Sequence, residues 1–131
     1  MKKITTIILF TFLCFTYGYG SNHSMHPLKQ INYVKKQIKA QQEPYYSAYL
    51  QLIHDADSIL KATHHALVDF SVPGFYIKPE EHRANSLALQ QDAFAAYCSA
   101  LAYILSGKKE YGEKACYFLN AWAFTNKKYS E

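Results

Sequence analysis

The sequence predicts an all-α protein built from antiparallel helical hairpins, and three observations support this fold class. Apolar residues recur every three or four positions in four separate segments, as they do along one face of a helix. Turn-forming residues separate these segments, with Pro44 at the start of the second and Gly107 before the fourth. No segment shows the strict alternation of apolar and polar residues that is typical of a half-buried strand.

Length and composition indicate one globular domain. The chain has 131 residues, of which 50% are hydrophobic and 18% are charged, and this excludes a disordered or collagen-like protein. The formal charge is +4, but Lys2 and Lys3 lie in a segment that we expect to be removed, which leaves 12 basic and 10 acidic residues. No run of five basic residues occurs, so the charge gives no reason to expect binding to nucleic acid or to a membrane surface.

Residues 1–20 are predicted to be a secretory signal peptide. Lys2 and Lys3 are followed by an uncharged apolar run over residues 4–15, and Gly18 and Gly20 supply the small residues that precede a cut before Ser21. The run is too short for a permanent membrane span, and residues 21–131 contain no other candidate span. We therefore expect a periplasmic or secreted domain over 21–131, with no membrane attachment once the signal is removed.

The first hairpin is predicted from two amphipathic segments. Lysines surround the apolar stripe of residues 27–41, which consists of Leu28, Ile31, Val34 and Ile38. A second helix is expected over residues 44–63, with Pro44 at a favoured first helical position. Its apolar face carries Tyr45, Tyr49, Leu52, Ile53, Ala56, Ile59 and Leu60.

The second hairpin follows an irregular stretch over residues 64–83, which contains Pro73, Gly74 and Pro79. A connection of this length is more often functional than not, or else disordered. The third helix is predicted over residues 85–106, and from Ala93 onward it is apolar on nearly every side, which predicts burial on several faces. The fourth helix is predicted over residues 109–125, and the polar residues 126–131 are expected to form no further element.

Two cysteines remain after the signal segment. Cys98 and Cys116 each lie nine residues from Gly107, so antiparallel helices place them at similar heights. Export permits a disulfide, but helix rotation decides whether the two side chains face each other. The simpler expectation is two small, buried residues in tight packing.

The last two helices are apolar around most of their surface, and this excess indicates neighbours beyond the present sequence. We therefore expect an N-terminal fragment of a larger helical protein. No Gly-rich phosphate loop, nucleophile elbow or Cys-rich zinc pattern is present, and His64 and His65 lack a nearby third ligand. No cofactor and no metal site are predicted.

The segment from His82 to Ala123 resembles the N-terminal part of the alginate lyase family. His26-Pro27 is similar to the start of such domains after a signal peptide. The most specific pieces are the run Leu-Asn-Ala-Trp-Ala at residues 119–123 and the upstream pairs Asp-Ala and Ala-Tyr. The full set of matching residues is His82, Arg83, Asn85, Asp92, Ala93, Ala96, Tyr97, Ala100, Leu101, Ala102, Tyr103, Gly107, Tyr111, Lys114, Ala115 and Leu119 to Ala123.

The resemblance implies an (α/α) toroid that binds an acidic polysaccharide and cleaves it by β-elimination. In that reaction a base removes the proton beside a neutralised uronate carboxylate, and an acid protonates the departing glycosidic oxygen. The resemblance assigns this chemistry to an Asn-Asn-His motif and to later Tyr and Arg positions. The sequence contains no Asn-Asn-His, so no catalytic residue is predicted within it, and the chain by itself is expected to be inactive.

The resemblance also implies a mobile loop over the substrate cleft, which corresponds here to residues 72–83. Tyr76 is the best candidate for sugar contact; alternatively, Phe75 and Tyr76 pin the loop to the helices. Arg83 could bind a uronate carboxylate, or pair with Glu80 or Asp92 on the surface. Asn85 could bind sugar hydroxyls, or cap the third helix.

Two other functions remain open at this stage. The same toroid could serve a heparinase-like or chondroitin-like lyase. Alternatively, the chain could be a non-enzymatic helical-repeat interaction module, because Gly107, Tyr111 and Ala115 resemble the middle of a tetratricopeptide repeat. The first hairpin does not repeat that pattern at the required 34-residue period, which favours the lyase.

Overall fold

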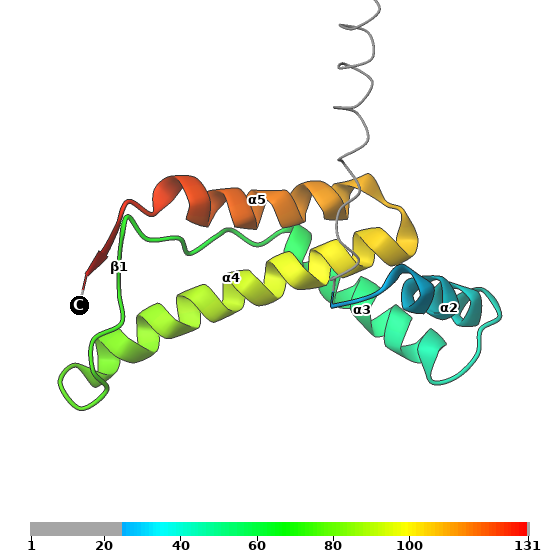
Figure 1. Cartoon of the computed structure of the whole chain (residues 1–131), viewed down its shortest axis with the longest axis horizontal. Coiled ribbons are helices and arrows are strands. Elements are labelled where there is room, and N and C mark those ends of the chain that lie inside the picture. The colour runs from blue at the N-terminus through cyan, green and yellow to red at the C-terminus, as the bar shows by residue number, and fades with distance from the viewer. Residues whose placement is uncertain (1–24, 131) are drawn as a thin grey trace, which may run out of the picture. The chain divides into compact units, whose positions relative to one another are not determined.

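The computed structural model describes residues 25–130, and this part of the chain contains four helices and two short strands (Figure 1). The predicted all-α class is confirmed, whereas the predicted signal peptide lies outside the described residues. In chain order the elements are α2 (Leu28–Lys39), α3 (Tyr45–Leu60), β1 (Asp69–Ser71), α4 (Pro79–Ser106), α5 (Lys109–Thr125) and β2 (Lys128–Ser130).

The helix boundaries agree with the sequence pattern except at the start of α4. Helix α5 has the predicted limits, and α2 and α3 each end within three residues of the predicted position. Helix α4, however, begins at Pro79, six residues before the predicted start at Asn85. Pro79 occupies a first-turn position that needs no N–H, and Glu80 and Glu81 favourably face the positive end of the helix dipole.

Helices α4 and α5 form an antiparallel hairpin that turns at Gly107 (Figure 1). Gly107 has a φ of 77°, and its N–H donates to the carbonyl of Tyr103 at 2.8 Å, which is the geometry of a left-handed helix C-cap. Gly112 allows the two helices to approach closely, because a Cβ atom there would lie 3.1 Å from the Tyr103 ring. The hairpin therefore depends on two glycines for different reasons.

The core lies where α3 packs against this hairpin. Ala56 of α3 meets Cys98, Ala102 and Tyr111, and Ile59 packs against both this group and a second buried cluster. The second cluster consists of Ala95, Ala96 and Phe118. Three of the four buried apolar residues of α4 are alanines, whose small side chains let neighbouring helices come close to its backbone.

Two short strands tie the long connection to the end of the described chain. Strands β1 and β2 pair in parallel, with Asp69 opposite Lys128 and Ser71 opposite Ser130. The expectation that the polar residues after α5 form no element is therefore wrong. Each strand has three residues, too few for an alternating pattern to be recognised in a sequence.

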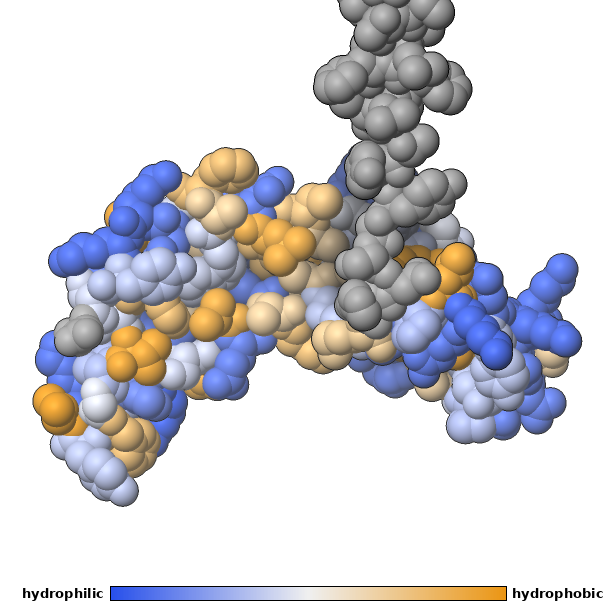
Figure 2. Space-filling model, in the orientation of Figure 1, coloured by the Kyte–Doolittle hydropathy of each residue, from blue (hydrophilic) through white to orange (hydrophobic). Residues whose placement is uncertain are grey.

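Apolar side chains on α4 and α5 remain exposed, and orange patches mark apolar surface in Figure 2. Phe94 is 59% exposed, Leu119 62% and Phe124 69%. The expectation that α4 is buried on several faces is thus wrong for residues 25–130, where Phe94, Tyr97 and Tyr103 of this helix all remain exposed. Within these residues no helix has the length and apolar character needed to cross a bilayer.

Candidate functional site

A buried carboxylate on α4 fixes the connection between α3 and α4 to the helical hairpin. Asp92 is 1% exposed, and its Oδ2 accepts hydrogen bonds from the backbone N–H of His65 at 2.8 Å and from Nε1–H of Trp122 at 2.7 Å. Nδ1 of His65 lies 2.8 Å from the other carboxylate oxygen. Removing a carboxylate from water is costly unless donors replace the lost hydration, and these three groups do so.

The hydrogen bonds determine which nitrogens of the two adjacent histidines carry protons. A carboxylate oxygen accepts hydrogen bonds, so Nδ1 of His65 is the donor to Asp92. His64 has the opposite arrangement: its Nδ1 accepts from the N–H of Ala66 at 3.2 Å, so its neutral ring carries the proton on Nε2. Over residues 25–130, no group of three or more potential ligands could hold a metal ion.

Aromatic residues of α5 also contact the chain between α3 and α4. The N–H of His64 donates to the hydroxyl oxygen of Tyr117 at 3.3 Å, and the two rings lie 5.4 Å apart. Trp122 contacts Phe70 of β1 edge to face at 5.3 Å. The residues before α4 are therefore held to α4 and α5 by several hydrogen bonds and ring contacts.

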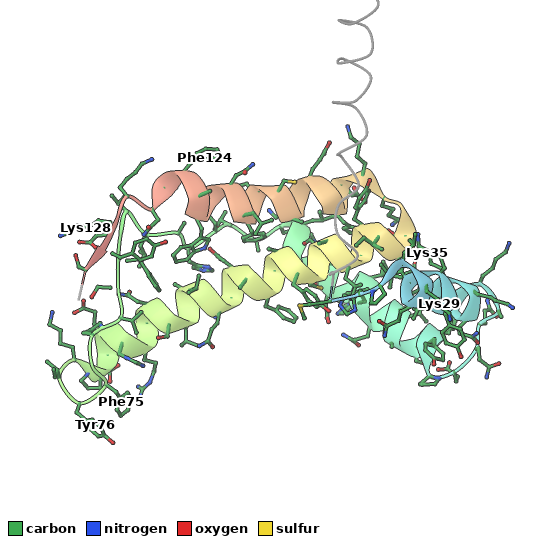
Figure 3. All side chains as sticks on the ribbon, viewed as in Figure 1. Lys29, Lys35, Phe75, Tyr76, Phe124 and Lys128 are labelled. Atoms are coloured by element: carbon green, nitrogen blue, oxygen red, sulfur yellow. The ribbon has the colours of Figure 1, made fainter. Side chains whose placement is uncertain are left out.

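The loop that carries Tyr76 follows β1 and protrudes beyond this anchored segment (Figure 3). The N–H of Ile77 donates to the carbonyl of Gly74 at 2.9 Å, which closes a turn at the tip. Phe75 contacts the ring of His82 at 5.6 Å, and Nδ1 of His82 donates to the carbonyl of Pro73 at 2.7 Å. Phe75 thus connects the loop to α4.

Tyr76 takes part in this loop differently from its neighbour. Its ring touches Phe75 edge to face at 5.6 Å, yet its side chain is 97% exposed. The alternative in which both aromatics pin the loop therefore fits Phe75 but not Tyr76. An exposed aromatic ring with a hydroxyl group can stack on a sugar and form a hydrogen bond with it.

The two other predicted site residues lie in the first turns of α4. Nδ2 of Asn85 donates to the carbonyl of Ser71 at 2.6 Å, and Asn85 is not a helix cap, because the helix begins at Pro79. Arg83 lies 3.4 Å from Glu80 in an exposed pair. Its suggested alternative partner, Asp92, is instead occupied by His65 and Trp122.

The structure does not gather the three predicted residues into one pocket. Residues two positions apart on a helix point to different sides, so Arg83 does not share the face on which Asn85 reaches Ser71. Tyr76 is at the exposed loop tip. Sequence reasoning also missed His65 as the partner of Asp92, since the two residues are 27 positions apart and no local pattern relates them.

The two cysteines are free thiols in different surroundings. Cys98 is buried in the core, whereas Cys116 is exposed, so these two cysteines form no disulfide and the expected burial of Cys116 is wrong. Burial, together with the nearby charge of Asp55, raises the pKa of Cys98. A buried thiol of this kind is unreactive.

Residues 33–130 match the family model described as alginate lyase. The match includes the anchored segment, the Tyr76 loop and all three predicted site residues, whereas His26-Pro27 precedes it. Comparisons with curated proteins and with solved structures found no match.

Proposed function

The chain belongs to the alginate lyase family, and from this premise we propose that it is the N-terminal portion of an exported polysaccharide lyase that cleaves alginate or a related uronate polymer. The family match over residues 33–130 carries the proposal. The reaction is a β-elimination, which needs a group to neutralise the uronate carboxylate, a base and an acid. The sequence lacks the Asn-Asn-His motif, so we assign none of these three roles to its residues.

The part of the reaction that we assign to this chain is substrate binding through the Tyr76 loop. Phe75 holds the loop to α4 through His82, while Tyr76 projects from it and is available to a sugar ring. Within residues 25–130 the one ion pair of Arg83 is an exposed, long contact with Glu80, which a uronate carboxylate can replace. The amide of Asn85 is engaged with Ser71, so we propose that it positions the loop.

Binding and turnover of short uronate oligomers by the purified chain test this proposal. Isothermal titration calorimetry should detect binding, while the ultraviolet absorbance of the unsaturated product should stay flat. Product formation would show that the chain contains its own catalytic groups and is not an inactive portion. If the chain binds no uronate oligomer, the proposed substrate class is wrong. If it prefers heparin or chondroitin oligomers, the proposed function changes to a heparinase-like or chondroitin-like lyase of the same fold.

Tyr76→Ala should weaken oligomer binding about two- to twelvefold, because an aromatic contact is worth roughly 0.5–1.5 kcal/mol. The melting temperature should hardly change, since Tyr76 is almost fully exposed. Phe124→Ala is the matched control: it removes another exposed aromatic ring, on α5, and should leave binding unchanged. Equal losses in the two variants would mean that Tyr76 has no specific role.

Export is a separate part of the proposal. We expect cleavage before Ser21, because the charged start, apolar run and Gly18-Tyr19-Gly20 site form a complete signal sequence. Mass spectrometry of periplasmic or secreted protein measures the mature N-terminus directly. Recovery of exported protein that retains residues 1–20 would contradict this expectation.

A further inference from the structure

Helix α2 has a charge composition unlike that of the remaining described residues. Its 12 residues include four lysines and no acidic residue. Elsewhere in residues 25–130 there are eight basic and nine acidic side chains, so positive charge is concentrated on this helix. Figure 2 shows hydrophilic surface over the region of α2.

Three of these lysines form a compact group, which we name the α2 lysine patch: Lys35, Lys36 and Lys39. At 3.6 residues per turn the three positions fall within an arc of about 100°. Lys39 is four and three positions from the other two, a spacing that makes side chains neighbours on a helix surface. All three side chains are exposed.

The patch is separate from the face by which α2 joins the fold. The apolar residues Val34 and Ile38 line a cavity of about 160 Å³ together with Tyr49, Leu52, Leu101 and Leu105. Packing therefore uses the apolar stripe of the helix and leaves the lysines to solvent. Lys35 and Tyr76 lie far apart in Figure 3, so the patch is also distinct from the Tyr76 loop.

No carboxylate within residues 25–130 forms an ion pair with the patch, because the ion pairs found there involve other basic residues. Lys36 and Lys39 lie in the last turn, where the helix dipole favours positive charge. The same dipole would favour acidic residues in the first turn, and none is present. The dipole thus favours two of these lysines, but no carboxylate of residues 25–130 balances the charge of the patch.

We propose that the α2 lysine patch is a secondary binding surface for the carboxylates of an acidic polysaccharide, an inference that rests on the proposed function. Lysine ammonium groups are flexible point charges and do not require one fixed carboxylate geometry, which suits a polymer with repeated charges. A polymer held at both the patch and the Tyr76 loop gains affinity by multivalency. A short oligomer, which reaches only one of them, does not.

The test compares alginate polymer with a short uronate oligomer on the full chain. The triple variant Lys35→Gln, Lys36→Gln and Lys39→Gln should bind polymer about tenfold more weakly, as expected for three exposed charge contacts. The loss should shrink at high salt, and oligomer binding should stay unchanged. The matched control is the triple variant Lys61→Gln, Lys109→Gln and Lys127→Gln, which removes the same charge from three other exposed sites and should retain polymer affinity.

Each failure has a distinct signature. If the wild-type chain binds neither polymer nor oligomer, the proposed function fails and the inference fails with it. If the wild type binds polymer but the two triple variants lose equal affinity or none, only the patch is refuted. If the patch variant keeps its polymer affinity but loses binding to vesicles that contain phosphatidylserine, the surface is a membrane contact instead.

Discussion

At the scale of single residues, Cys98 and Cys116 have chemically identical side chains that differ in their exposure to solvent. Their sequence positions are symmetric about Gly107, which makes a disulfide possible but does not decide it. In the folded chain Cys98 packs against Ala56 and Tyr111, while Cys116 is exposed on α5. The rotation of each helix about its axis places one thiol inside and the other outside.

Iodoacetamide should therefore label Cys116 rapidly and Cys98 hardly at all in the native protein. The thiolate is the reactive species, and burial raises the pKa of Cys98 and also blocks access. Peptide mapping by mass spectrometry measures both sites, and labelling in denaturant supplies the control in which they should react alike. A peptide pair linked by a disulfide under non-reducing conditions would contradict the two-thiol state.

At the scale of elements, Asp92 joins three parts of the chain that the sequence presents separately. Its carboxylate lies on α4, accepts from Trp122 on α5 and receives two hydrogen bonds from His65 in the connection before β1. The connection was predicted as one long irregular stretch, but its first part is bound to the hairpin. Only the later part, around Tyr76, protrudes.

Asp92→Ala should lower the free energy of unfolding by about 1–3 kcal/mol, because it leaves the partly buried donors of His65 and Trp122 without their acceptor. Denaturant titration followed by circular dichroism measures this loss. Asp69→Ala is the control, since Asp69 pairs with Lys128 at an exposed position and should cost less than about 1 kcal/mol. Similar losses in both variants would show that Asp92 is not the main anchor.

At the scale of the whole molecule, the contact between Tyr111 and Asp57 connects α5 to α3 across the core. The Tyr111 ring is fully buried, and its hydroxyl donates to Asp57 at 2.5 Å. Burial, followed by the hydrogen bond and the charge of Asp57, raises the pKa of Tyr111 to about 12. At neutral pH this tyrosine stays protonated and is a structural donor rather than a base.

This pKa predicts a loss of stability at alkaline pH. The unfolded chain releases the Tyr111 proton near pH 10 and the folded chain only near pH 12, so the contribution is complete below pH 10 and is lost between the two values. The loss should be up to about 3 kcal/mol. Chemical denaturation from pH 9 to 12 measures it, with Tyr111→Phe as the reference that lacks this ionisation. Parallel pH profiles for the two proteins would contradict the prediction.

The sequence by itself determined the helices and the family, because both can be recognised from patterns of residues that are close together in the chain. Apolar spacing of three and four residues predicted α2, α3 and α5 closely, and the Leu-Asn-Ala-Trp-Ala run at residues 119–123 supported the resemblance that the family match confirms. The early start of α4 was also readable, since Pro79, Glu80 and Glu81 form a typical helix start.

Only the tertiary structure decided which distant side chains meet. His65 and Trp122 reach Asp92 across 27 and 30 positions, and β1 pairs with β2 although each strand has only three residues. These contacts depend on how α4 and α5 are rotated and on the path of the chain between α3 and α4. The spacing of apolar residues predicts neither the helix rotation nor the path of the chain. It shows which residues share a face of one helix, but not which face of another element they will contact.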